Sequence, residues 1–290
     1  MKVFIAGASG LVGGNVFRHL SSRNIEVLGS HFSFPTKYTI GYDTLNMPSS
    51  GEDPLVKFSP DWIVHCGALT WVDYCEEHPL ESYEKTVRST KNLVEKAKKI
   101  GAKMLYISSD YVFDGENGPY IESDELNPLS VYGRHKLEAE THVLEELPDS
   151  LSLRITNVYG DEERNKNFVS RLIELSSDKE ERELKLPVDQ YATPINAYDV
   201  ARCIGHLITE NKSGIYHLAS TDFLNRMQLA QRVLSYFPNE QIKLSSVFTS
   251  ELKQAADRPL MGGLIAKRFL DEHPNFKFSN LDDYLKSKSS

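Results

Sequence analysis

A glycine-rich turn, Gly7-Ala8-Ser9-Gly10-Leu11-Val12-Gly13, constrains the fold of this 290-residue chain more than any other feature. It follows an apolar run at 2–6 that predicts a buried strand, and it precedes a pattern at 11–22 with helical spacing. Gly7 permits the tight turn, Gly10 lets the backbone approach a pyrophosphate, and Gly13 lets the helix pack closely on the strand. The free N–H groups at the helix N-terminus suit phosphate oxygens. This context predicts a dinucleotide-binding Rossmann fold, with Ser9, Leu11 and Val12 also lining the cofactor.

Further apolar runs alternate with helical patterns along the first half of the chain. Strands are predicted at 25–29, 61–66, 103–108 and 151–155, and helices at 79–100 and 128–146. This alternation predicts parallel βαβ units in an α/β doubly wound sheet.

The regular alternation of strand and helix patterns ends after about residue 160. The patterns there predict a helix at 161–182, a strand at 183–187, a helix at 198–209 and a strand at 215–218. We therefore expect two units: a Rossmann domain of residues 1–160, with a return segment at about 188–217, and a smaller discontinuous C-terminal lobe of residues 161–187 and 218–290. A cleft between two such lobes is a common place for a substrate.

Composition excludes several classes of protein. The formal charge of −8 and the lack of a long basic run argue against a nucleic-acid-binding surface. No apolar stretch approaches the roughly 20 residues that cross a bilayer, and the first apolar run is too short for a signal-peptide core. Three cysteines without a pairing pattern suit a reducing cytoplasm. No metal site is expected, because the chain has neither a Cys-x-x-Cys nor a His-x-x-x-His pair.

The end of the second predicted strand bears on the choice of dinucleotide. An acidic residue there would bind the ribose 2′-hydroxyl and favour NAD, but the strand ends in Ser30-His31. Ser30, His31 and Lys37 can instead accommodate a 2′-phosphate. The sequence therefore favours NADP, with NAD as the alternative.

A tyrosine and a lysine stand four residues apart in the helix predicted at 128–146. This spacing places Tyr132 and Lys136 on one helix face. A nearby positive charge lowers the pKa of a tyrosine, which can then exchange a proton with a carbinol or a ketone. Ser109 directly follows the strand predicted at 103–108, and the carboxyl end of a parallel strand is where such sheets bind ligands. Its hydroxyl can hold a substrate oxygen or, alternatively, cap a turn.

Together these motifs resemble an extended short-chain dehydrogenase/reductase. The segment Tyr106-Ile107-Ser108-Ser109-Asp110-Tyr111-Val112-Phe113-Asp114-Gly115 is similar to the block typical of dTDP-4-dehydrorhamnose reductases, as is Tyr132-Gly133-x-x-Lys136-Leu137-x-x-Glu140. Further similarities lie at Val72-Asp73, Asp189-Gln190 and Arg258-Pro259, so the resemblance covers nearly the whole chain. It implies a cytoplasmic enzyme of deoxysugar or polysaccharide biosynthesis that reduces a nucleotide-diphosphate 4-keto-6-deoxysugar with NAD(P)H.

The resemblance also implies roles for single residues. Ser109 would orient the substrate oxygen, Tyr132 would donate the proton, and Lys136 would tune Tyr132 and bind the nicotinamide ribose. Asp43 matches the residue that contacts adenine, and Asn157 matches a position near the nicotinamide and the substrate. The other cofactor contacts would be Thr44, Leu45, Cys66, Gly67, Ala68, Thr86, Ile107 and Ser108, and the other substrate contacts Thr70, Asp73, Asp110, Gln190 and Arg258.

Two departures from the family pattern leave the sugar and the nucleotide base open. Thr86 stands where the family commonly has an asparagine that helps to hold a proton-relay water. The family's Arg-Pro-x-Asn-Ser block is replaced by Arg258-Pro259-Leu260-Met261-Gly262. Two other functions stay open: a nucleotide-sugar epimerase or dehydratase with tightly bound NAD, and a non-catalytic regulatory subunit like that of methionine adenosyltransferase, which shares this branch. The family analogy further implies a homodimer through the helices at 79–100 and 128–146.

Overall fold

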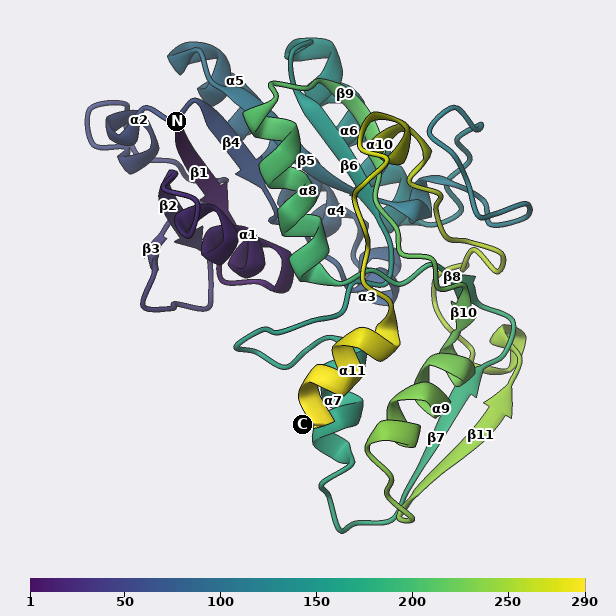
Figure 1. The fold of residues 1–290 in the computed structure, drawn as a ribbon. Helices are drawn as coiled ribbons and strands as arrows, with labels where there is room; N and C mark the ends of the chain where they lie inside the picture. The colour runs from purple at the N-terminus through teal and green to yellow at the C-terminus, as the bar shows by residue number, and fades with distance from the viewer. Residues whose placement is uncertain (290) are drawn as a thin grey trace.

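The computed structural model describes residues 1–289, and its centre is a parallel sheet of seven strands (Figure 1). In spatial order the strands are β3 (Thr39–Gly41), β2 (Glu26–His31), β1 (Lys2–Ala6), β4 (Trp62–His65), β5 (Lys103–Ser109), β6 (Leu151–Ile155) and β9 (Gly214–His217). The chain builds outward from β1 in one direction and then, starting at β4, in the other. This reversal confirms the predicted doubly wound Rossmann sheet.

Helices cover both faces of the sheet. On one face lie α1 (Leu11–Ser21), α8 (Ala197–Thr209) and α10 (Lys267–Glu272), and on the other lie α2 (Pro54–Phe58), α5 (Ser89–Ile100) and α6 (Val131–Glu146). Successive side chains of β1 point to opposite faces of the sheet. Val3 and Ile5 therefore belong to the first core, whereas Phe4 and Ala6 belong to the second. A strand with two buried faces reads as a continuous apolar run, as residues 3–6 do.

A smaller unit lies beside the sheet (Figure 1). Its elements are α7 (Phe168–Leu175), β7 (Arg182–Pro187), α9 (Arg226–Tyr236), β11 (Ile242–Val247) and α11 (Leu281–Ser289), with the ribbon of β8 (Tyr191–Ala192) and β10 (Leu224–Asn225) nearby and the 3₁₀ turn η3 (Thr249–Glu251). β7 and β11 pair in parallel, and Leu172, Val233 and Leu285 belong to the core of this unit. The chain leaves the smaller unit to form α8 and β9 on the main sheet and then returns. None of the described helices has the length and apolarity that a membrane span needs.

The helix predicted at 161–182 is wrong for most of its length, because only α7 is helical there. Asn167 caps α7 by accepting a hydrogen bond from the Ser170 amide at 3.0 Å. The Glu162 carboxylate accepts from the Asn167 amide at 2.6 Å, and Asn165 has a positive φ of 45°. Side chains that hydrogen bond to the local backbone thus stabilise a loop where the charge pattern suggested a helix.

The helix predicted at 79–100 is interrupted. It consists of α4 (Pro79–Ser82), a π-helical turn η1 (Tyr83–Arg88) and α5, and a short α3 (Val72–Glu77) precedes it. The Thr90 hydroxyl donates at 2.6 Å to the Thr86 carbonyl, which is the acceptor that an α-helix assigns to the Thr90 amide. The Thr90 hydroxyl thus competes with the Thr90 amide for this carbonyl, next to the wider π-helical turn η1.

The helix predicted from residue 128 starts at Val131 instead. The Ser130 hydroxyl caps α6 by accepting from the Gly133 amide at 3.2 Å, so the helix cannot extend back to Pro128 in this conformation. Gly133 itself packs against the 3₁₀ turn η2 (Asp110–Val112), since a Cβ at this position would lie 2.2 Å from the Tyr111 carbonyl oxygen. The start of α6 therefore lies directly against the end of β5.

A buried ion pair fixes the rest of α6 on the sheet. Glu140 of α6 lies 2.5 Å from the Arg154 guanidinium of β6, and both side chains are almost fully buried. The Ser152 hydroxyl donates a further hydrogen bond to Glu140 at 3.0 Å. Because each charge is paired and hydrogen-bonded, the pair holds α6 in one position along β6.

Replacing Glu140 with glutamine should destabilise the protein strongly, because it leaves the Arg154 charge buried without its partner. We expect a loss of about 3–5 kcal/mol in the free energy of unfolding, measured by urea denaturation. The matched control is Glu138→Gln on the same helix, which removes a half-exposed ion pair with Lys91 and should cost less than about 1 kcal/mol. Equal losses in the two variants would contradict this account of α6.

Candidate active site

Ser109 and Tyr132 meet at the carboxyl end of β5. Ser109 is the last residue of β5 and is buried, and Tyr132 lies in the first turn of α6. The two side chains lie close enough for the Ser109 hydroxyl to lower the pKa of Tyr132 in part. The Ser109 hydroxyl also lies 3.2 Å from an Asp110 carboxylate oxygen and 3.3 Å from the Tyr111 amide, so it caps η2 as well. The two hydroxyls border the sheet edge where doubly wound folds bind ligands.

Lys136 lies beneath this pair. Its side chain is buried, and its Nζ donates at 2.5 Å to the Ile107 carbonyl and lies 4.2 Å from the centre of the Tyr106 ring. Burial lowers the pKa of Lys136 to about 7, although the negative charge of Glu140 acts in the opposite direction. The lysine is therefore close to its titration midpoint at neutral pH.

The expected effect of Lys136 on Tyr132 is wrong in this structure. Burial raises the pKa of Tyr132, and the hydrogen bond with Ser109 opposes this shift only in part. The ammonium of Lys136 hydrogen bonds to the Ile107 carbonyl instead. Tyr132 consequently keeps its proton at neutral pH.

The glycine turn forms a backbone cradle in which side chains at positions 7 and 13 would not fit. Gly7 has a φ of +86°, and a Cβ on Gly13 would lie 2.3 Å from the Gly7 carbonyl oxygen. Gly10 caps α1 without a side-chain hydrogen bond, so the first N–H groups of the helix remain available to an anion. An open pocket beside the turn is lined by Ala8, Ser9, Gly10, Gly14, Phe17, Arg18, Thr36, Tyr38, Glu162 and Glu163. These features fit the pyrophosphate of a dinucleotide.

Residues predicted to contact the adenosine follow β2 and β3. His31 ends β2, and its Nδ1 lies 2.9 Å from the Thr39 hydroxyl of β3. Asp43 accepts from the Leu45 amide at 2.8 Å, and the Thr44 hydroxyl lies 2.7 Å from that of Ser89 at the start of α5. These bonds order the segment in which the predicted adenosine contacts lie.

Arg18 is a cation at the glycine pocket that the sequence reasoning missed. It lines this pocket together with Gly14, one helical turn earlier in α1, and its guanidinium donates to the Asp161 carbonyl at 3.1 Å. The helical spacing from Gly14 was the available signal.

The segment after β4 packs directly on the glycine turn. A Cβ on Gly7 would lie 3.0 Å from the Gly67 amide nitrogen, so the two backbones abut. Thr86 of η1 is buried, and its hydroxyl accepts from the Leu69 amide at 3.4 Å, which ties the segment that contains Ala68 to η1. Burial raises the pKa of Cys66 to about 12, so its thiol stays protonated. The buried Ser108 hydroxyl has no hydrogen-bond partner within residues 1–289.

The predicted substrate residues lie in three different environments. Asp73 forms a 2.6 Å ion pair with Arg258, and Asp110 accepts from the Gly263 amide at 3.4 Å, so both join the sheet to the segment around 256–264. Thr70 is exposed in the segment before α3. Gln190 belongs to a separate network, because its amide donates to Thr249 at 3.0 Å and to Gln254 at 3.1 Å.

Arg226 is a second cation that the sequence reasoning missed. Its guanidinium donates at 2.8 Å to the Asn157 side chain, lies 5.1 Å from the centre of the Phe168 ring, and acts electrostatically on Asp110 and Tyr111. The cavity at this position is lined by Asn157, Val158, Tyr159, Phe168, Val169, Arg226 and Leu229. The signal in the sequence was the capping box of Asn225 and Gln228, which starts α9 at Arg226.

Comparison with known proteins places the chain in a family. A family profile described as the RmlD substrate binding domain matches residues 1–281. The chain belongs to this family. The resemblance drawn from the motifs is thereby confirmed.

Solved structures and curated relatives are consistent with membership of the RmlD family. A dTDP-4-dehydrorhamnose reductase from Clostridium acetobutylicum superimposes with a TM-score of 0.87 at 29% identity, covering 100% of both chains. A dTDP-4-dehydrorhamnose reductase from Bacillus anthracis, solved in complex with NADP, gives 0.86 at 26% identity, covering 99% of this chain and 97% of that one. Methionine adenosyltransferase 2 subunit beta of Bos taurus is 30% identical over 90% of this chain and 77% of its own length. A probable low-salt glycan biosynthesis reductase of Haloferax volcanii is 28% identical over 89% of this chain and 88% of its own.

Adding a methyl group at Gly13 of this RmlD-family chain should disrupt the cradle. Gly13→Ala forces Cβ against the Gly7 carbonyl, so we expect a stability loss of about 1–3 kcal/mol and dinucleotide binding weakened by at least about tenfold. Fluorescence titration with NADPH measures the binding. Gly51→Ala is the control, because a Cβ there meets no atom within 4 Å. Unchanged NADPH affinity in folded Gly13→Ala would contradict the assignment.

The titration of Lys136 should be visible in the stability of the protein. Between about pH 7 and the unfolded-state pKa near 10.4, the unfolded chain carries a proton on Lys136 that the folded chain lacks, so stability rises with pH in this window. The free energy of unfolding of wild type minus that of Lys136→Met should rise by about 1 kcal/mol per pH unit between pH 7 and 9. Lys91→Met should show no such slope, because the ion pair with Glu138 raises the pKa of Lys91. A flat difference for Lys136→Met would show that its charge is not penalised by burial.

Proposed function

We propose that the chain is an oxidoreductase that uses NADPH to reduce the keto group of a nucleotide-diphosphate 4-keto-6-deoxysugar. The observation that carries the proposal is the meeting of Ser109 and Tyr132 above buried Lys136 at the end of β5, beside a glycine cradle that fits a dinucleotide. Similarity to dTDP-4-dehydrorhamnose reductases, one of them solved with NADP, supports the reaction class and the cofactor. NAD is the alternative cofactor.

The side chains have distinct roles in this reaction. When bound, the reduced dinucleotide supplies the hydride that the ketone carbon accepts. Tyr132 donates its proton to the oxygen of the same carbonyl, and its raised pKa keeps the phenol protonated until that oxygen becomes basic. Ser109 donates a hydrogen bond to the substrate oxygen and orients it between the two hydroxyls. Lys136 holds the Ile107 carbonyl and thereby the end of β5 beneath the reacting group.

The smaller unit supplies the substrate lobe in this proposal. Of the segments expected to form this lobe, 161–187 and 218–290, α10 packs on the main sheet instead. The remainder carries Arg226 and Arg258, whose guanidinium groups suit the oxygens of a diphosphate. The contact of Arg226 with Asn157 places one of these cations beside the segment that follows β6. The pairing of Arg258 with Asp73 holds the other beside α3.

The proposed location of the protein is the cytoplasm. The three cysteines are free, which suits a reducing cytoplasm. We also propose a homodimer through the outer surfaces of α5 and α6. Sedimentation velocity tests the dimer, and a monomer at micromolar concentration would contradict it.

A non-catalytic regulatory subunit is the second candidate. The similarity to methionine adenosyltransferase 2 subunit beta, at 30% identity, favours it. Such a protein would bind the dinucleotide, co-purify with a catalytic partner and turn over no keto-sugar. Turnover of any nucleotide-diphosphate 4-keto-6-deoxysugar would exclude a purely regulatory role.

Tyr132→Phe should remove the proton donor without disturbing the cofactor site. We expect kcat to fall by about 10²- to 10⁴-fold, measured by the decrease in NADPH absorbance, while the affinity for NADPH stays within a factor of two or so. Tyr198→Phe is the matched control, because that phenol is more than half exposed on α8 and its ring contacts His19. Near wild-type turnover in Tyr132→Phe would show that another group is the acid.

A further inference from the structure

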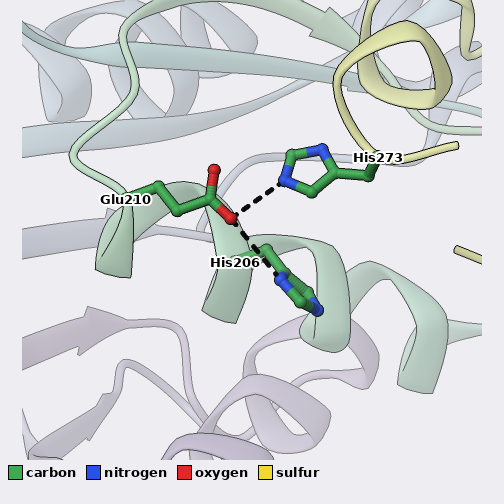
Figure 2. Close-up of side chains that lie close together, drawn as sticks. All are labelled: His206, Glu210 and His273. Carbon is green, nitrogen blue, oxygen red and sulfur yellow. Dashed lines mark hydrogen bonds and ion pairs between the residues drawn. The ribbon is translucent and has the colours of Figure 1, made fainter. Parts of the chain in front are cut away.

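A cluster of two histidines and a glutamate lies on the outer side of the sheet, apart from the proposed active site. His206 lies in the last turn of α8, Glu210 follows four residues later as the C-cap of this helix, and His273 directly follows α10 (Figure 2). One side-chain nitrogen or oxygen from each residue lies within 4.8 Å of the other two. The proposed reductase chemistry uses none of these groups.

The orientation of the His273 ring leaves its Nε2 facing another acceptor. Nδ1 lies 3.1 Å from the Phe269 carbonyl, which can only accept, so Nδ1 carries the proton in this contact. In the neutral ring Nε2 is then an unprotonated acceptor, and it lies 3.0 Å from the Glu210 Oε1 atom. Stacking on Phe269, with 4.5 Å between ring centres, holds the ring in this position. Two acceptors at this distance need either a proton or a metal ion between them.

The remaining contacts complete a ligand set. His206 Nδ1 lies 3.8 Å from the same Oε1 atom of Glu210. The other oxygen of Glu210 lies 3.5 Å from Lys212 Nζ, so an outer partner orients the carboxylate and leaves Oε1 to the histidines. Ligands about 2.1 Å from a tetrahedral zinc ion lie roughly 3.4 Å apart. Glu210 Oε1 lies 3.0 and 3.8 Å from the two imidazole nitrogens, and all three atoms lie within 4.8 Å of one another, so zinc binding requires side-chain rotations.

We propose that His206, Glu210 and His273 bind Zn²⁺ through Nδ1, Oε1 and Nε2, respectively. Two imidazoles and a carboxylate are a common protein ligand set for zinc. Solvent supplies the fourth ligand, because the His206 and Glu210 side chains are 46% and 40% exposed. The ion joins α8 to α10 across 63 residues and so secures the chain segment that leads to α11.

Paired cysteines and paired histidines, which the chain lacks, would have revealed a metal site in the sequence, but this cluster contains neither. His206-x-x-x-Glu210 has the same helical spacing as a His-x-x-x-His pair, and the third ligand is distant in sequence. The prediction that the chain holds no metal is therefore replaced by this proposal.

Zinc titration of the full-length, chelator-treated protein tests the site. We expect one equivalent of Zn²⁺ to compete with a chromophoric chelator and to raise the melting temperature, since a ligand that binds only the folded state stabilises it. Glu210→Gln and His273→Gln should each weaken zinc binding by at least about tenfold and remove the thermal shift. Circular dichroism establishes that the variants fold, and Mg²⁺, which prefers oxygen ligands, should give no shift at equal concentration.

The chain provides a close control for helical spacing alone. His142 and Glu146 are also one turn apart, on α6, but within residues 1–289 no second histidine joins them, and Lys98 pairs with Glu146. His142→Gln should therefore leave the zinc affinity and the thermal shift unchanged. The proposal is overturned if wild type binds no zinc, which would make the cluster an ion pair of protonated His273. It is also overturned if zinc binds the Glu210 and His273 variants as tightly as wild type.

Discussion

The buried pair of Glu140 and Arg154 determines where α6 lies, and the proposed active site depends on that position. Lys136 is one helical turn before Glu140, and Tyr132 is one turn before Lys136, so the ion pair sets the distance of both from the end of β5. Arg154 is further satisfied by His217, with 3.3 Å between Nη1 and Nε2; burial lowers the pKa of His217 to about 3, so this ring stays neutral and can accept. An apolar contact in place of the Glu140–Arg154 pair would bury as much surface but would fix the position of α6 along β6 less strictly.

The parallel sheet brings the other parts of the site to the same edge. β1, β4, β5 and β6 end in the glycine turn, the segment at 66–69, Ser109 and the segment that contains Asn157. Three polar contacts then connect this edge to the later part of the chain: Asp73 to Arg258, Asp110 to Gly263, and Asn157 to Arg226. The residues proposed to bind the substrate thus also hold the two parts of the molecule together. Substrate binding and the relative position of the two parts should therefore be coupled.

Local patterns predicted the parts of this structure that depend on local physics. The apolar period, the glycine spacing and the Tyr132–Lys136 face predicted most strands of the sheet, the cradle and the helix that carries Tyr132 and Lys136. Contacts between distant residues were not predictable: the partner of Arg258 is 185 residues away, and Arg226 approaches Asn157 across 69. The pKa of Tyr132 was predicted in the wrong direction, because the spacing along a helix does not reveal how deeply a group is buried. The helix expected at 161–182 failed because its polar side chains bind the backbone of a loop.

The most direct test of the account follows a labelled hydrogen through the reaction. Wild-type protein is incubated with NADPH deuterated on the transferred face of the nicotinamide and with a nucleotide-diphosphate 4-keto-6-deoxysugar, and the sugar nucleotide is analysed by mass spectrometry and NMR. The account predicts a reduced sugar that carries deuterium at carbon 4, with stoichiometric formation of NADP. Isomerised or dehydrated sugar without net oxidation of the dinucleotide, or no turnover of any such sugar by protein that binds NADPH, would contradict it.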